Sequence, residues 1–160
     1  MNIIEISHED DAMAVRSPQE RVEHIIEGIL ASEGIGDVEI SCSFVSDDTI
    51  RSLNRTYREK DEPTDVLSFV LEGTDSADGP PITWPTEAQS RILGDIVISL
   101  ESVERNSLEF EVPFEEELDR VIVHGTLHLL GEDHATNDMT EPMLLHQESL
   151  LNALRHGGPN

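Results

Sequence analysis

The chain has 160 residues, and its 34 Asp and Glu against 10 Lys and Arg give a formal net charge of −24. This length fits one domain with its own apolar core, and the single cysteine, Cys42, excludes a fold held together by internal disulfides. No apolar stretch approaches the roughly 18 residues of a membrane span, and the N-terminus lacks the basic and apolar regions of a signal peptide, so we expect a cytoplasmic protein without membrane contact.

The N-terminal part of the sequence predicts a strand, a helix and a second strand. Residues 2–6 alternate around two isoleucines, as in a short strand. Ser17 followed by proline is typical of a helix start, and apolar residues then recur at helical spacing over 18–34. Residues 38–44 alternate between apolar and polar side chains, which indicates a half-buried strand with Cys42 on its inward face.

The rest of the chain predicts two more strands and then helices. In chain order we expect a helix over 49–57 with Ser46 in its cap, a strand over 65–71, a long surface loop over 73–91, a strand over 93–99, and helices over 100–110, 113–130 and 138–154. The loop is either a functional lid or a disordered insert. Residues 156–160 are expected to form a flexible tail.

The order of these elements predicts the fold class. Two strands that follow one another in sequence suggest an antiparallel pair, and helices gathered towards the C-terminus favour layers over a doubly wound sheet. We therefore predict an α+β fold, with a small mixed four-stranded sheet and about five helices in one domain over residues 1–155.

Three of the seven histidines lie in one short segment, HGTLHLLGEDH over residues 124–134. His124 and His128 are four positions apart, so on a helix they share one face with Cβ atoms about 5–6 Å apart. Gly131 allows the backbone to leave the helix in a left-handed conformation, and His134 can then return to the same point. We predict a metal site at the end of this buried helix, with His124, His128 and His134 as ligands.

The alternative is that these are core histidines bonded to carbonyls or water. The surrounding helix is apolar nearly all round, and unpaired imidazoles on a buried helix are costly, which favours a metal. Three imidazoles suit one Zn²⁺ per chain, and other divalent transition metals also bind such a set. Asp133 could orient a histidine ligand by accepting a hydrogen bond from the ring nitrogen that does not bind the metal. Gly125 stands where zinc proteases carry their catalytic Glu, so a peptidase is disfavoured.

The remaining histidines occur singly and suit surface or core roles; they are His8, His24, His146 and His156.

The few basic residues are unevenly distributed. A net charge of −24 repels nucleic acid at long range, and it is typical either of proteins from salty cytoplasms or simply of a very soluble surface. Four of the ten Lys and Arg, however, lie within residues 51–60. Arg51 and Arg55 suit a solvated helix face, whereas Arg58 differs because it lies where the predicted helix ends beside a strand.

Two further segments accompany the histidine motif, LNRTYREKDEPTDVLSF over 53–69 and LGDIVI over 93–98. In this order, the three segments resemble the YbeY family of bacterial rRNA maturation endoribonucleases. The resemblance implies an α+β fold with one bound metal, usually zinc, and a role at the 3′ end of small-subunit rRNA and in ribosome quality control. It also implies that the three histidines of the motif are metal ligands, that Arg58 is the active-site arginine and that Asp133 is the acidic residue of the motif.

We therefore expect a single-strand-specific, metal-dependent endoribonuclease, a hydrolase of phosphodiester bonds, with Arg58 and Asp133 as catalytic residues. Its expected partners are RNA, the small ribosomal subunit and ribosome-associated proteins. The general base stays open between Asp133, Glu132 and Asp95; alternatively, the 2′-hydroxyl of the RNA attacks and the metal activates it. Two alternatives also stay open: a non-catalytic ribosome-binding maturation factor with a structural metal, whose fourth ligand would be Glu132 or His146, and a metal-dependent hydrolase of another substrate.

Overall fold

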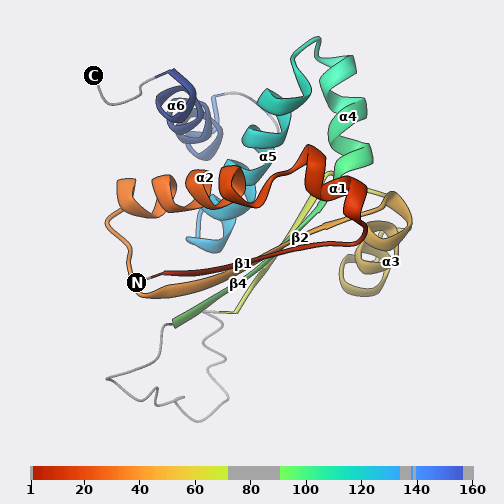
Figure 1. Ribbon diagram of the computed structural model, residues 1–160, viewed down its shortest axis with the longest axis horizontal. Coiled ribbons are helices and arrows are strands. Elements are labelled where there is room, and N and C mark those ends of the chain that lie inside the picture. The colour runs from red at the N-terminus through yellow and green to blue at the C-terminus, as the bar shows by residue number, and fades with distance from the viewer. Residues whose placement is uncertain (1, 72–90, 134–137, 139, 157–160) are drawn as a thin grey trace.

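The computed structural model describes residues 2–71, 91–133, 138 and 140–156, and these form four strands and six helices (Figure 1). In chain order the elements are β1 (Ile3–His8), α1 (Asp11–Arg16), α2 (Gln19–Ser32), β2 (Val38–Val45), α3 (Asp47–Arg58), β3 (Val66–Val70), β4 (Arg91–Ser99), α4 (Leu100–Glu109), α5 (Phe114–Leu129) and α6 (Pro142–His156). The predicted loop over 73–91 lies outside the described residues except for Arg91, which belongs to β4, and the predicted tail lies outside them except for His156, in α6.

The strands form one sheet in the order β1-β2-β4-β3. Strand β2 pairs in parallel with β1 and with β4, whereas β3 pairs antiparallel with β4. The predicted α+β class, the mixed four-stranded sheet and the antiparallel pair of sequence neighbours are thus confirmed. Strand β3 lies at one edge of the sheet, directly after α3, and this edge carries the candidate site.

Alternation along β2 separates the two faces of the sheet. Its apolar residues are buried beneath α2 and α5, which lie on the same side of the sheet (Figure 1). Cys42 belongs to this set, and burial raises the pKa of its thiol to about 12, so the thiol stays protonated and packs as a small apolar group. A second, smaller cluster lies on the other face, where Ile50 of α3 packs with Leu67 and Val97.

Helix α1 has no counterpart among the predicted elements. The Asp10 carboxylate caps it by accepting from the Met13 N–H, but none of its residues is buried, so it carries no apolar periodicity that could reveal it. The prediction that Ser17 caps the following helix is wrong. Ser17 ends α1 instead, where its hydroxyl donates to the Met13 carbonyl oxygen, and Pro18 precedes α2.

Helix α5 is the central helix and packs unusually close to the sheet at Gly125. A Cβ atom at this position would lie 2.8 Å from Cγ2 of Ile96 and 3.3 Å from Cγ2 of Val66. The Ser68 hydroxyl donates to the Gly125 carbonyl oxygen at 3.2 Å. The absence of a side chain therefore lets α5 lie against β3 and β4. Gly131 follows the helix with φ of +95°, in the positive range that the sequence predicts for the helix exit.

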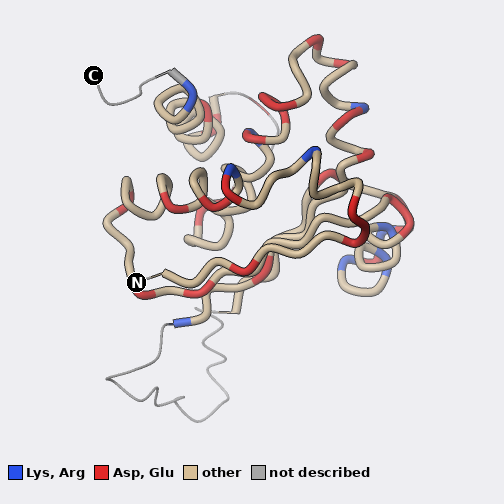
Figure 2. Tube along the Cα trace, in the orientation of Figure 1, with Lys and Arg blue, Asp and Glu red and all other residues tan. Residues whose placement is uncertain are grey.

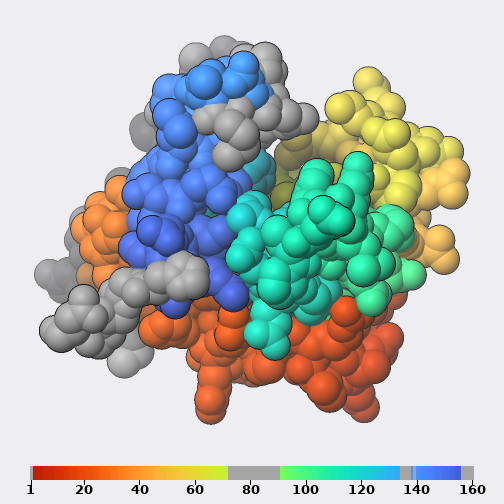
Figure 3. Space-filling model, turned by 90° about the horizontal axis from the view of Figure 1, so that it is seen from above, coloured from red at the N-terminus to blue at the C-terminus, as the bar shows by residue number. Residues whose placement is uncertain are grey.

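Charge is distributed unequally over these elements. Asp and Glu are spread along the chain, whereas Lys and Arg gather around α3 (Figure 2). On the side away from the sheet, α6 packs beside α5, and α5 beside α4 (Figure 3). Among the described residues, no helix combines the length and the apolar character that crossing a membrane requires.

Candidate active site

A cavity of about 360 Å³ opens between the edge of the sheet and the C-terminal end of α5. Its lining comes from the end of α3, from β3 and from the last turn of α5 with the residues after it: Arg58, Val66, Leu67, Ser68, Val70, His124, His128, Gly131, Glu132 and Asp133. Four of the five residues proposed from sequence as site residues therefore meet in one cavity. The fifth, His134, lies outside the described residues.

The two described histidines of the motif have the geometry of a shared metal site. Nε2 of His124 lies 3.1 Å from Nε2 of His128. Two imidazole nitrogens that share a tetrahedral zinc ion with bonds of about 2.0–2.1 Å lie about 3.3 Å apart. The pair therefore fits a metal without a change of backbone, and both rings are only partly buried, so the ion would face the cavity.

The orientation of the His124 ring is set by a buried side chain of α6. Nδ1 of His124 donates to Oε1 of Gln147 at 2.6 Å, and the Gln147 amide nitrogen donates in turn to Glu148 at 3.1 Å. Gln147 is 5% exposed. Because Nδ1 carries the proton in this arrangement, Nε2 presents its lone pair towards His128, as metal ligation requires.

Arg58 reaches the cavity from the far side of the edge strand. Glu59, in a left-handed conformation with φ of +59°, ends α3 directly after Arg58. The guanidinium donates to the Ser68 carbonyl oxygen at 2.9 Å. A guanidinium has five N–H donors and this bond uses one, so the group can also contact an anion in the cavity.

Asp133 is the exposed acidic group of the cavity. Its side chain is 85% exposed, and Oδ1 lies 3.9 Å from Nδ1 of His128, which is too long for a direct hydrogen bond. Glu132 also lines the cavity. Asp95 does not lie among the lining residues, and its β4 neighbour Val97 packs on the α3 face of the sheet; Asp95 therefore shares that face, away from the histidines.

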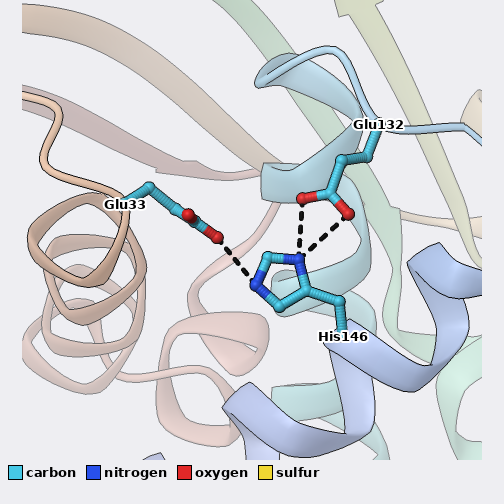
Figure 4. A group of neighbouring side chains, drawn as sticks. All are labelled: Glu33, Glu132 and His146. Carbon is cyan, nitrogen blue, oxygen red and sulfur yellow. Dashed lines mark hydrogen bonds and ion pairs between the residues drawn. The ribbon is translucent and has the colours of Figure 1, made fainter.

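A second group of possible metal ligands lies beside the cavity (Figure 4). Glu33, Glu132 and His146 each offer a ligand atom, and these atoms lie within 4.8 Å of one another. Nδ1 of His146 lies 2.9 Å from Oε2 of Glu132, and Nε2 lies 2.8 Å from Oε1 of Glu33. The three residues come from the end of α2, the segment after α5, and α6.

The charges in this group favour a protonated histidine when no cation is bound. The hydrogen bond that His146 donates to Glu132 raises the pKa of His146; burial opposes this, and the charges of Glu132 and Glu33 add to the increase. His146 thus links two carboxylates from different parts of the chain. Because Glu132 also lines the cavity, this group connects the wall of the cavity to α2 and α6.

Glu33 and Gln147 were not identified as site residues from sequence. His146 was expected in a surface or core role, or else as the fourth ligand of a structural metal, and no local spacing connects Glu33 to it. Gln147 lies 23 residues from His124. Packing of α6 against α5 brings His146 and Gln147 to the motif, and packing of α2 against both helices brings Glu33, so no pattern within one element could have identified them.

Comparisons with known proteins show which proteins this chain is similar to. A family model described as "Endoribonuclease YbeY" matches residues 3–155. A protein of Treponema denticola named "Endoribonuclease YbeY" is 42% identical over 151 residues, which is 94% of this chain and 92% of the relative. One of the same name from Halalkalibacterium halodurans is 43% identical over 118 residues, 74% of this chain and 73% of that protein. A solution structure of a Thermotoga maritima protein is similar with a TM-score of 0.58 and 32% identity, covering 95% of this chain and 89% of that one.

Proposed function

This chain belongs to the endoribonuclease YbeY family, and from that premise we propose that it is a metal-dependent endoribonuclease specific for single-stranded RNA. As a family member it is an enzyme, a hydrolase that cleaves RNA phosphodiester bonds. One observation carries the proposal further: Arg58, His124, His128 and Asp133, from separate segments of the chain, line a single cavity.

We assign the metal to His124, His128 and His134, with one divalent transition metal per chain and zinc as the first choice. The 3.1 Å separation of the two described Nε2 atoms supports this assignment, and the bond from His124 to Gln147 supports the ligating tautomer. When bound, such an ion polarises a phosphoryl oxygen and lowers the pKa of water.

Two other side chains act on the substrate in this proposal. Arg58 binds a non-bridging phosphate oxygen and offsets the negative charge that grows in the transition state. Its bond to the Ser68 carbonyl oxygen holds the guanidinium at the mouth of the cavity before the RNA arrives. Asp133 accepts at Oδ1 the proton of the attacking water or 2′-hydroxyl as its oxygen bonds to phosphorus and the bond to the leaving ribose oxygen breaks; that oxygen takes a proton from solvent. The exposed position of Asp133 in the cavity permits this role.

The biological part of the proposal follows the family. The substrate is rRNA near the 3′ end of the small-subunit molecule, and the enzyme acts in rRNA maturation and ribosome quality control in the cytoplasm. Its partners are the small ribosomal subunit and ribosome-associated proteins. Residues 1–155 act as a single catalytic domain, which agrees with a family match over 3–155.

The test compares the wild-type protein with Arg58→Ala and His128→Ala. Metal content is measured by elemental mass spectrometry, and cleavage is measured on an end-labelled single-stranded RNA. We expect about one zinc per chain in the wild type and in Arg58→Ala, and none in His128→Ala. We expect Arg58→Ala to lower kcat by roughly 100-fold, as for loss of one charge-stabilising donor.

Arg55→Ala is the matched control, because it removes the same charge from an exposed position on α3 that does not line the cavity. Its kcat is expected to stay within about threefold of wild type. Full cleavage by Arg58→Ala with metal bound would overturn the role of Arg58. A wild-type protein that takes up no metal, even after reconstitution, would overturn the metal site.

A further inference from the structure

The surface next to the cavity is the basic part of a strongly acidic protein. Residues 51–60 carry four of the ten Lys and Arg, and all four are exposed. Figure 2 shows them together around α3. One of them, Arg51, is paired with Asp61 through two hydrogen bonds. A polyanion therefore meets less repulsion along α3 than along the acidic remainder of the described surface.

The sequence's single tyrosine lies in this basic segment. Tyr57 precedes Arg58 at the end of α3 and is 64% exposed. Its ring contacts Phe69 of β3 in an edge-to-face arrangement, with centroids 5.4 Å apart and an interplanar angle of 71°. The Arg58 guanidinium carbon lies 6.0 Å from the same Phe69 ring. An exposed aromatic ring and the arginine of the cavity thus flank one supporting side chain.

This juxtaposition matches what single-stranded nucleic acids bind: aromatic faces for the bases beside cations for the backbone. We propose that Tyr57, supported by Phe69, stacks on one base of the RNA while Arg58 contacts the phosphate next to it. The proposal rests on the function above and adds a subsite to it. Phe69 restrains the Tyr57 ring, so less rotamer freedom is lost when a base stacks on it.

The subsite favours single-stranded RNA over duplex RNA. Stacking uses the π-face that every base has, so it does not select one base by hydrogen bonding. In a duplex those faces are covered by neighbouring bases, and only unpaired bases can be splayed onto a protein ring. Tyr57 is therefore a specificity-determining residue that favours single strands.

The experiment measures kcat and KM of the zinc-loaded protein on a single-stranded RNA of about ten nucleotides, together with variants of that RNA in which one base at a time is removed. We expect Tyr57→Ala to raise KM roughly 5- to 100-fold with kcat within about twofold of wild type. Tyr57→Phe keeps the ring and should stay within about threefold. In the wild type, loss of one particular base should weaken binding, and in Tyr57→Ala that loss should have no further effect.

Two further proteins make the test specific. Phe110→Ala removes another exposed aromatic ring, 59% exposed, at the end of α4 and not lining the cavity; it should leave KM unchanged. Tyr57→Leu keeps apolar contact with Phe69 without a π-system, so it replaces Tyr57→Ala if the alanine variant does not fold.

RNA binding is followed separately by the fluorescence of Tyr57. In a Trp84→Phe background Tyr57 is the remaining emitter, and a base stacked on it should quench its emission.

The outcomes separate the subsite from the proposed function. If the wild type cleaves RNA but Tyr57→Ala and Tyr57→Leu keep its KM, the subsite is wrong and the function stands. The subsite is also wrong if RNA binds without changing the tyrosine emission, or if the single-base penalty persists in Tyr57→Ala. If the wild type neither binds nor cleaves RNA, the proposed function itself fails.

Discussion

Gly125 allows α5 to lie against the sheet, and the histidines depend on that placement. A side chain at Gly125, the residue after His124, would project onto Ile96 and Val66. A carboxylate at this position would therefore be buried against β3 and β4. A zinc-protease glutamate could not act from here, and the departure from the protease motif therefore has a structural reason. Packing, and not chemistry, selects glycine at this position.

We predict that Gly125→Ala lowers the free energy of unfolding and weakens metal binding. The new Cβ lies 2.8 Å from a methyl group of a stiff, buried isoleucine, and overpacking of this kind costs about 1–3 kcal/mol. Better helix propensity offsets up to about 1 kcal/mol of that. Urea unfolding measures the net loss. Gly36→Ala is the control, because a Cβ there meets nothing within 4 Å; equal stability of the two variants would contradict the prediction.

Gln147 gives a second prediction at the scale of single residues. Gln147→Ala removes the acceptor of the His124 Nδ1 proton, and loss of such an orienting partner typically weakens metal affinity by about 10- to 100-fold. Gln147→Glu keeps an acceptor oxygen and should retain most of the affinity. Competition with a chromophoric chelator measures the zinc Kd of each. An unchanged Kd in the alanine variant, with its fold intact by circular dichroism, would show that Gln147 does not orient the ligand.

Among the elements, α3 and α4 are joined by one carboxylate. Oδ1 of Asp47, in the first turn of α3, accepts from the hydroxyls of Ser99 and Ser102 at 2.7 Å each. Its Oδ2 accepts from Arg105 at 2.6 Å. Burial acts to raise the pKa of Asp47, but the bonds from Arg105 and the two serines outweigh it, so the pKa is lowered. This network holds the helix that carries Arg58 and Tyr57.

The lowered pKa of Asp47 determines how the stability of the fold should change with pH. Asp47 binds a proton more readily in the unfolded chain, where its pKa is about 4, than in the folded protein. The network therefore stabilises the fold fully above that unfolded pKa, and the stabilisation is lost as the pH falls through the lower pKa of the folded state. We expect Asp47→Asn to be about 1–2 kcal/mol less stable than wild type at pH 7, with the difference narrowing at pH 3. Urea unfolding at both pH values measures this.

Asp48→Asn is the matched control for that prediction. It removes the same charge from the next residue of the same helix turn, where the side chain is exposed. Its effect at pH 7 should stay within about 0.5 kcal/mol. A difference between Asp47→Asn and wild type that stays constant from pH 7 to pH 3 would show that the ionised carboxylate is not the source of the stabilisation.

For the whole molecule, self-repulsion is the dominant electrostatic property. With a net charge of −24 in 160 residues, repulsion between acidic groups destabilises the compact state, and added salt screens it, because the Debye length falls from about 10 Å at 0.1 M to about 3 Å at 1 M. We expect Tm to rise by about 3–5 °C between 0.1 M and 1 M KCl. The same concentrations of NaCl should raise Tm by the same amount.

Thermal unfolding followed by circular dichroism measures this dependence. A Tm that does not change with salt would contradict the role given to self-repulsion. Loss of the helical signal at about 0.01 M salt, where the Debye length is about 30 Å, would indicate adaptation to a salty cytoplasm. Retention of the fold at that concentration would indicate an acidic surface that serves solubility.

Local patterns in the sequence predict most of the helices and strands. Alternation over 38–44 and helical spacing over 113–130 correctly predicted β2 and α5, because burial of one face imposes a short period on the residues. The motif of His124, His128 and His134 could be recognised for the same reason, since its spacing falls within one helix and the turn after it. Helix α1 escaped prediction because none of its residues is fully buried, so it shows no apolar periodicity.

Long-range packing supplied what the local patterns lack. Strand β4 lies between β2 and β3, and α5 crosses close to this sheet edge, so Arg58 meets His124 across more than sixty positions of sequence. The contacts from Gln147 to His124 and from His146 to Glu33 arise in the same way, from packing of α6. Such meetings depend on strand order and helix docking, whose free energy is distributed over the whole core. No single element carries a pattern that encodes them.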